Sequence, residues 1–131
     1  MKMSKPIQII NFDDFLPADG ESRFSLHFVD AVLTLEIYFE DDESSVELMR
    51  RLRFESAKYF IKTPFPGYSF FSCAEDRDVS LLNSLVQYET SDMLKHEVGA
   101  DLVNEYKHYR LYLHSSGAAI HVIAKSCDFS D

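Results

Sequence analysis

The stretch that decides the fold spans residues 23–40 and reads RFSLHFVDAVLTLEIYFE. On both sides of Asp30 and Ala31, large apolar side chains occupy every second position, the period of a strand with one buried face. If Asp30 and Ala31 form a two-residue turn, three apolar pairs face each other. These pairs are Phe24 with Ile37, Leu26 with Leu35, and Phe28 with Leu33. The sequence therefore predicts an antiparallel hairpin, with a longer loop as the alternative because Asp-Ala is not the favoured Asn-Gly turn.

The same pattern continues downstream in residues 46–55. Four apolar residues of this segment share one parity: Val46, Leu48, Leu52 and Phe54. We interpret the segment as a further strand, but SSVELMRRL also has the serine cap and the helix formers of an α-helix. Apolar residues change parity at Tyr59 and Ile61, which predicts a bulge or bend near Ser56. The prolines of TPFPG end this segment because they cannot donate to a sheet.

Residues 84–98, SLVQYETSDMLKHEV, predict a strand that leads into a short helix. Thr90 or Ser91 can cap this helix, and Gly99 ends it. Met93, Leu94 and Val98 are expected to face inward. The first twenty residues predict a lead-in whose apolar side chains dock on the core. Those side chains are Ile7, Ile9, Ile10, Phe12 and Phe15.

A second hairpin is predicted for residues 108–124, HYRLYLHSSGAAIHVIA. With Ser116 and Gly117 at the centre of the turn, Leu113 faces Ile120 and Leu111 faces Val122, so one face is apolar. The opposite face gathers polar rings and an arginine, with Tyr112 paired to His121 and His114 diagonal to His121. The candidate ligand-binding residues on this face are His108, Arg110, Tyr112, His114 and His121.

Three functional interpretations of this polar face compete. Two imidazoles, His114 and His121, make half a metal site, and no cysteine or carboxylate of the hairpin completes it. His121 as a general base would need a nucleophile, and no nucleophile motif is present. A recognition surface for an anion or an acidic partner patch fits the residue types. The alternative is a solvent face, or a face covered by the short helix. The sequence thus predicts no catalytic residue, no metal and no cofactor.

The net charge of the chain indicates which classes of partner to expect. The chain has 131 residues, which fits a single domain over residues 1–131, and 13 Lys and Arg stand against 22 Asp and Glu for a formal charge of −9. This balance argues against nucleic acids and anionic membranes and is compatible with a basic protein partner. The acidic run Glu40, Asp41, Asp42 and Glu43 is the candidate partner-binding site.

The acidic run and the arginines near it also have simpler interpretations. The run lacks the ligand spacing and the glycine of a calcium loop, so a solvated turn is the alternative. The cluster Arg50, Arg51 and Arg53 could clamp an anion, but we expect it to pair with acids such as Glu47 and Glu55.

The N-terminal segment and the cysteines bear on the compartment. The segment lacks the apolar core of a signal peptide, and no later stretch is long and apolar enough for a membrane span, so the sequence predicts a cytoplasmic protein. Cys73 and Cys127 match no metal or redox spacing. They are expected as free thiols in a reducing compartment, with a single disulfide as the alternative.

Two segments carry a family likeness. SLVQYETSDML followed by YKHYRLYLHSSGAAIHVIAKS resembles the C-terminal half of a group of small cytoplasmic bacterial proteins of uncharacterised function. The motif consists of a serine at a helix start, an HYR-Y strand and an x-V-I-A strand. It contains no catalytic or ligand-binding pattern. The likeness covers roughly the last fifty residues and supports the fold without indicating a function.

Together these patterns predict a strand-dominated α+β domain. We expect an antiparallel sheet of about six strands, built from hairpins and able to curl into a sandwich or partial barrel, with one short helix. The first functional hypothesis is a non-enzymatic protein-binding module, in its specific version an immunity-type inhibitor of a basic toxin. The second is a small-molecule or anion binder, or a weak hydrolase, that uses the polar face of residues 108–124. A homodimer through an edge strand is a third kind of interaction.

Overall fold

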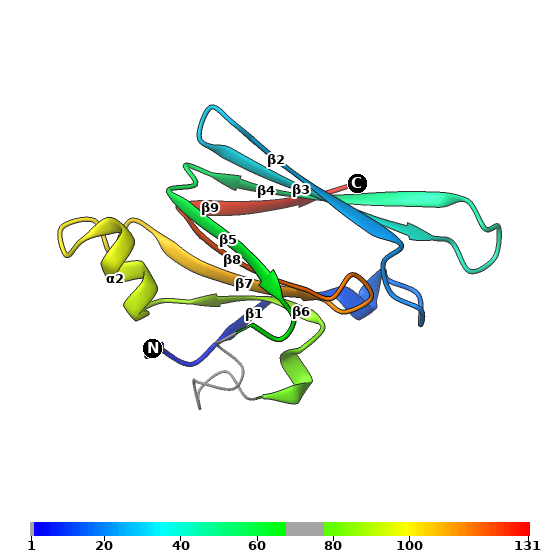
Figure 1. Ribbon diagram of the computed structural model, residues 1–131, viewed down its shortest axis with the longest axis horizontal. Helices are drawn as coiled ribbons and strands as arrows, with labels where there is room; N and C mark the ends of the chain where they lie inside the picture. Colours follow the sequence, from blue (N-terminus) through cyan, green and yellow to red (C-terminus); the bar gives the residue numbers. More distant parts are fainter. Residues whose placement is uncertain (1, 68–77) are drawn as a thin grey trace.

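Two antiparallel sheets pack face to face in the computed structural model, which describes residues 2–67 and 78–131 (Figure 1). The five-stranded sheet has the order β1-β6-β7-β8-β5 and the four-stranded sheet the order β2-β3-β4-β9. The strands are β1 Ile7–Asn11, β2 Arg23–Val29, β3 Val32–Glu40, β4 Glu47–Glu55, β5 Tyr59–Pro64, β6 Ser84–Tyr88, β7 Lys107–Leu113, β8 Ala118–Ala124 and β9 Ser126–Ser130. The helical elements are the 3₁₀ turns η1 Phe12–Asp14 and η3 Val79–Leu81 and the helix α2 Asp92–Val98.

The predicted class is confirmed, but the strand count is wrong. The described residues form nine strands in two open sheets rather than about six strands in one, and these sheets do not close into a barrel. The strands that sequence reasoning missed include β1 and β9, which have five residues each. β9 begins at Ser126, two residues after β8 ends at Ala124. Because no turn sequence lies between them, the sequence does not show that the chain passes from one sheet to the other.

The hairpin of β2 and β3 has the predicted register throughout, with Phe24 opposite Ile37, Leu26 opposite Leu35 and Phe28 opposite Leu33. Asp30 and Ala31 form the two-residue turn, and both have a positive φ, 52° and 63°. These angles match the turn type whose twist suits a hairpin. Asp-Ala therefore closes a tight turn although neither residue is glycine.

Residues 46–55 form strand β4 from Glu47 on, and the helical alternative is wrong. The strand places Leu52 opposite Leu35 and Phe54 opposite Leu33, so it extends the apolar face that the hairpin began. Ser56, with φ 52°, turns the chain out of the four-stranded sheet and into β5 of the other sheet. The predicted bend near Ser56 is confirmed.

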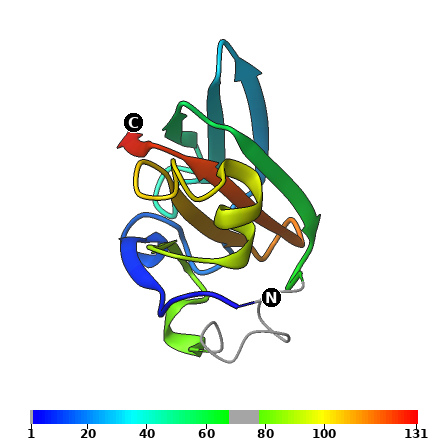
Figure 2. The ribbon, with the colours of Figure 1, turned by 90° about the vertical axis from the view of Figure 1, so that its left-hand side faces the viewer.

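Helix α2 also follows the prediction. The side chain of Ser91 caps it by accepting a hydrogen bond of 3.0 Å from the backbone N–H of Leu94. Of the three residues predicted to face inward, Leu94 is fully buried, whereas Met93 and Val98 are half-buried. Gly99 ends the helix with φ 77°. Figure 2 shows α2 from its own end of the molecule.

The register predicted for the second hairpin is wrong by two residues. Strands β7 and β8 are joined by four residues, 114–117, rather than by Ser116 and Gly117 alone. Leu111 therefore faces Ile120, and His121 lies opposite Arg110 instead of Tyr112. Because the shift is an even number, the division into an apolar and a polar face is unchanged.

The core lies between the sheets and combines side chains of both. Its fully buried members include Leu35, Leu52 and Phe54 from the four-stranded sheet and Leu111 and Ile120 from the five-stranded sheet. The lead-in joins this core only in part. Phe12 is buried, but Ile7 and Ile9 are 46% and 43% exposed, which corrects the expectation that both dock on the core. In the part of the chain that the structure describes, no helix has the length and apolarity to cross a membrane.

Candidate functional site

The polar face of β7 and β8 is covered. His108, Arg110, Tyr112 and His121 are at most 1% exposed, and only His114 of the five candidate ligand-binding residues reaches solvent. α2 packs against β7, and a small apolar cluster forms around Val86 and Tyr88 of the neighbouring strand β6. Met3 and Leu81 complete that cluster. Of the alternatives for this face, the structure shows the covered one.

A hydrogen-bonded chain runs through this buried layer. Nδ1 of His108 lies 2.8 Å from Oγ of Ser91, and its Nε2 lies 2.8 Å from Nδ1 of His121. Two arrangements of protons satisfy the chain with both rings neutral: either Ser91 donates to His108 and His108 to His121, or both bonds run the other way. The chain ties the first turn of α2 to both strands of the hairpin. Sequence reasoning placed His121 opposite Tyr112 and diagonal to His114, because it used the shifted register.

Arg110 occupies the middle of the same layer. Its Nε donates to the hydroxyl of Tyr88 at 3.3 Å, and its Nη1 donates to the carbonyl of Leu81 at 3.1 Å. Its guanidinium lies 4.2 Å from the ring centroid of Tyr112. These contacts hold β6, η3 and β7 around the guanidinium of Arg110.

Burial lowers the pKa of His108 well below its usual 6.5. The neighbouring His121 and the positive charge of Arg110 lower it further. A neutral His108 that is fully buried and engaged at both ring nitrogens is not placed to exchange protons with a substrate. We therefore interpret the Ser91–His108–His121 chain as structural. Among residues 2–67 and 78–131, no three His, Cys, Asp or Glu side chains are grouped to hold a metal ion.

The outer face of the four-stranded sheet holds a serine, a histidine and a glutamate together. Oγ of Ser25 donates to Oε1 of Glu36 at 3.2 Å, and Nε2 of His27 lies 3.2 Å from that same Oγ. The carboxylate and the hydroxyl thus meet the same ring nitrogen, whereas a catalytic triad uses the two nitrogens separately. The Arg51 guanidinium, 3.0 Å from Glu36, lowers the pKa of that carboxyl.

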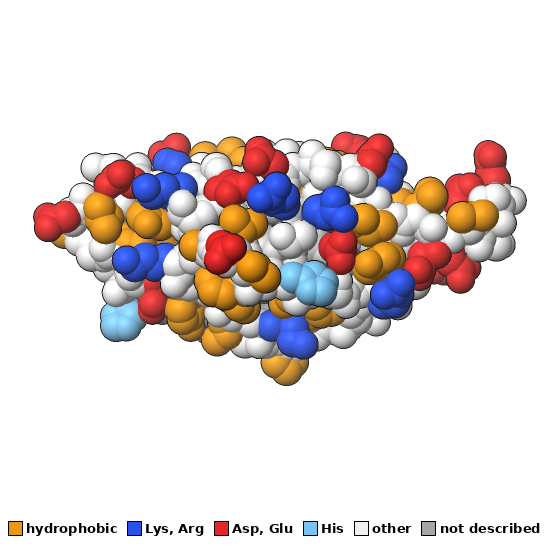
Figure 3. All heavy atoms as spheres, turned by 90° about the horizontal axis from the view of Figure 1, so that it is seen from above, with side chains coloured by type: hydrophobic (Ala, Val, Ile, Leu, Met, Phe, Trp, Pro, Cys, Tyr) orange, Lys and Arg blue, Asp and Glu red, His pale blue; other side chains and the backbone are white. Residues whose placement is uncertain are grey.

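This face is an exposed network of paired charges. Arg23 bonds Glu47 at 2.9 Å, and Arg53 lies 3.3 Å from Glu55. Of the predicted pairings of the arginine cluster, Arg53 with Glu55 is confirmed, whereas Glu47 pairs with Arg23 of β2 instead. Figure 3 shows basic and acidic side chains interspersed over this face, while the tip formed by the β3–β4 connection carries acidic ones.

Acidic side chains converge at that end of the molecule. Three adjoining hollows of about 520, 220 and 130 Å³ lie there. Residues of the segment 13–21 line all three, and residues of the segment 40–45 line the two smaller ones. The carboxylates that line them are Asp13, Asp14, Asp19, Glu21, Glu40, Asp41 and Asp42. We call this set the acidic end. No lysine or arginine is among the described residues that line the three hollows.

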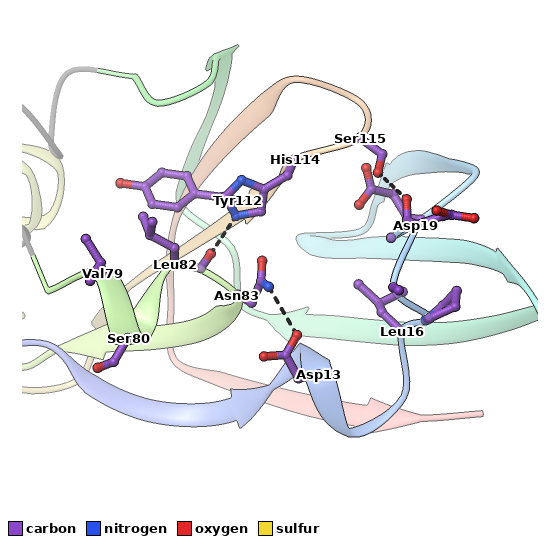
Figure 4. A pocket seen from close by; sticks show the side chains of 14 residues that line it. Asp13, Leu16, Asp19, Val79, Ser80, Leu82, Asn83, Tyr112, His114 and Ser115 are labelled. Carbon is purple, nitrogen blue, oxygen red and sulfur yellow. Dashed lines mark hydrogen bonds between the residues drawn. The ribbon is translucent and has the colours of Figure 1, made fainter.

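Hydrogen bonds fix the walls of the largest hollow (Figure 4). Nε2 of His114 donates to the carbonyl of Leu82 at 3.0 Å, and Nδ2 of Asn83 donates to Asp13 at 3.1 Å. Oγ of Ser115 donates to the backbone carbonyl of Asp19 at 2.7 Å. The hollow therefore joins the 13–21 segment to the end of β7 and the start of β6.

Glu21 is the residue of this end that sequence reasoning missed most clearly. Its side chain is 5% exposed, and it accepts a hydrogen bond of 2.6 Å from the backbone N–H of Ser116 in the β7–β8 connection. The turn-rich sequence PADGES at residues 17–22 indicated a loop. Nothing in that pattern indicated that the loop would reach a hairpin 95 residues further on. Of the predicted partner-binding residues, the structure places Glu40, Asp41 and Asp42 at the acidic end, with Glu43 exposed in the adjoining connection.

Cys127 is a free thiol on the core side of β9, while Cys73 lies outside the described residues. Burial, and next the carboxylate of Asp128, raises the pKa of Cys127 to about 12. A thiol with so high a pKa is a poor nucleophile at neutral pH.

No family model matches the chain, and neither the curated proteins nor the solved structures include a match. The likeness to small bacterial proteins stays a prediction.

Proposed function

We propose that this chain is a non-enzymatic protein-binding module whose acidic end binds a basic surface of another protein. The observation that carries the proposal is the convergence of two acidic segments around adjoining hollows whose described lining has no lysine or arginine. Carboxylates gathered in this way attract lysine and arginine side chains and accelerate association. The net charge of −9 acts in the same direction.

The test uses a defined basic probe and two variants that lose equal charge. Glu40→Gln with Asp42→Asn removes two carboxylates from the acidic end, and Glu89→Gln with Asp101→Asn removes two exposed ones elsewhere. The probe is an octa-arginine peptide, with octa-glutamate as the negative control. Binding is measured by calorimetry at low and high salt.

We expect the first double variant to bind octa-arginine about tenfold more weakly than the second, with affinity falling steeply as salt rises. Equal loss in both variants would mean that only net charge acts, and the acidic end would then not be the binding surface.

The specific version of the proposal is an immunity-type inhibitor that covers the active site of a basic nuclease toxin. Size, acidity and the structural role of the buried histidines support it. Its test is co-expression with the product of a neighbouring gene, if that gene encodes a basic nuclease. The nuclease should be toxic alone and tolerated with the wild-type chain, and the Glu40→Gln, Asp42→Asn variant should protect less well. Toxicity that persists with the wild-type chain would exclude this version.

A second candidate function is a small-molecule site in the hollow of about 520 Å³, a volume typical of ligand pockets. Tyr112 and His114 line it, but so do Asp13, Asp19 and Glu21, which favour a cationic or neutral ligand over an anion. Hydrolysis has less support, because the hydroxyls of Ser115 and Ser80 already donate to Asp19 and Asp78. NMR of the His114 ring with spermidine and with phosphate tests this candidate, and unchanged shifts with both would exclude it.

A further inference from the structure

Each sheet has two edge strands, and three of these four edges have a feature that discourages pairing with another chain. β1 has five residues and a register shift between Gln8 and Ile10. β5 contains Lys62 and ends at Pro64, and β9 has five residues with Asp128 at its centre. Short length, irregular register, proline and charge are the ways in which proteins protect an exposed edge.

β2 lacks these features except for one charge, Arg23 at its first position, which is paired with Glu47. It has seven residues in unbroken register with β3 and contains no proline, lysine, aspartate or glutamate. It is the last strand of its sheet. Phe28 is 51% exposed and Val29 65% exposed, at the end of the hairpin that projects from the molecule in Figures 1 and 2.

The register shows which backbone groups of β2 point outward. Next to a two-residue turn the flanking residues, Val29 and Val32, form a hydrogen-bonded pair, and such pairs alternate along a hairpin. His27 and Ser25 therefore bond to β3, while the N–H and C=O groups of Phe24, Leu26 and Phe28 point to the open edge. Among the described residues no backbone hydrogen bond reaches these N–H groups.

We propose that β2 pairs with β2 of a second copy of this chain, antiparallel and about a two-fold axis at Leu26. In this register Leu26 faces Leu26 of the partner subunit, and Phe24 faces Phe28 of the partner subunit. Each facing pair has outward N–H and C=O groups, so each can exchange two backbone hydrogen bonds. The two four-stranded sheets become one continuous sheet.

The edge favours a second copy because it is complementary to itself. Two-fold pairing needs apolar residues spaced evenly about the axis, and Phe24 and Phe28 lie two residues on either side of Leu26. Carboxylates are absent from β2, so the edges can approach within an otherwise acidic protein. The register also brings Asp30 of one copy to the strand end that holds Arg23 of the other. This proposal does not depend on the proposed function.

The first experiment is sedimentation velocity of the full chain over a range of concentrations. We expect a species of twice 15.2 kDa that dissociates on dilution. Leu26→Pro removes an outward N–H that β3 does not use, so the variant should sediment as a monomer, with circular dichroism to verify the fold. A wild-type chain that stays at 15.2 kDa up to about 1 mM would overturn the proposal, and so would a folded Leu26→Pro variant that dimerises as tightly as wild type.

The second experiment tests the register and does not depend on the proline variant. In Leu26→Cys the two thiols would face each other across the axis, with Cα atoms roughly 5.5 Å apart, within the range of a disulfide. In the control Ser25→Cys, the thiols would lie on the diagonal at roughly 7–8 Å. Mild oxidation should give a reducible dimer about tenfold more abundant for Leu26→Cys than for Ser25→Cys or for the wild-type chain. Equal cross-linking of the two variants would overturn the register.

Discussion

The two hairpins, β2–β3 and β7–β8, have the same alternation of apolar and polar residues but opposite environments on the polar side. In β2–β3 the polar face carries Ser25 and His27 and is wet, with its charges paired across neighbouring strands. In β7–β8 the polar face carries His108 and Arg110 and is buried under further segments. A period of two shows which side chains share a face. It does not show whether that face meets water, because coverage is decided by elements distant in sequence.

The largest difference in stability between the two polar faces is expected when an arginine is removed from each. Arg110→Ala removes the donor of two buried-layer hydrogen bonds, to the Leu81 carbonyl and to the Tyr88 hydroxyl, and should lower the free energy of unfolding by about 3 kcal/mol. Arg51→Ala, on the wet face, should cost less than about 1 kcal/mol. Urea unfolding measures both. Equal costs would show that the layer around Arg110 is not closed to water.

The protein should become less stable in acid because of the buried residue His108. Because the pKa of His108 is lowered in the folded state, only the unfolded chain takes up this proton as the pH falls below 6.5. The free energy of unfolding should therefore decrease on acidification, by at most about 1.4 kcal/mol per pH unit for this residue. Thermal unfolding between pH 7.5 and 5 tests this. His108→Gln should flatten the decrease and His27→Gln should not; the same slope in His108→Gln would assign it to other groups.

The two serines give a smaller contrast. Ser91→Ala removes the cap of α2 and one end of the buried chain and should cost about 1 kcal/mol. Ser25→Ala removes one exposed and one part-buried hydrogen bond at the wet face and should stay within about 0.5 kcal/mol. Chemical unfolding of the two variants provides the comparison. A larger cost at Ser25 would contradict it.

The turns should give the smallest effects, with opposite signs. Ala31 has φ 63° and Gly117 has φ 66°, so each occupies the region that glycine tolerates best. Ala31→Gly should stabilise the protein by about 0.5 to 1 kcal/mol, and Gly117→Ala should destabilise it by a similar amount. A methyl at Gly117 would meet no other atom, so the change reports backbone strain alone. Calorimetric melting temperatures of the two variants test the signs.

Local patterns predicted several elements correctly. The alternation over residues 23–40 defined the first hairpin and its register, and Ser91 and Gly99 marked the ends of α2. The register of β7–β8 was missed because Ser115, Ser116 and Gly117 suit a tight turn and a longer connection equally well. β1 was missed because its pairing with β6 joins segments more than seventy residues apart and leaves Ile7 and Ile9 exposed.

The candidate site was predicted only in its parts. The acidic run at residues 40–43 was visible in the sequence, but its neighbours Asp19 and Glu21 were not, since the hydrogen bond from Ser116 to Glu21 connects residues far apart. The ring-bearing face of β7–β8 was also visible. Its contacts come from outside the hairpin: α2 packs against β7, Arg110 bonds to the carbonyl of Leu81, and the ring of Phe65 packs on Tyr112.

The sequence by itself determined the strand-rich class, the division of each hairpin into two faces and the acidity of the surface. These properties depend on the alternation of side chains along a strand and on the count of charges, both of which are local or additive. Only the tertiary structure decided which polar face is buried, which histidines form a pair and which carboxylates converge. These properties depend on contacts between segments distant in sequence, and such contacts form because each sheet must cover its apolar face with the other.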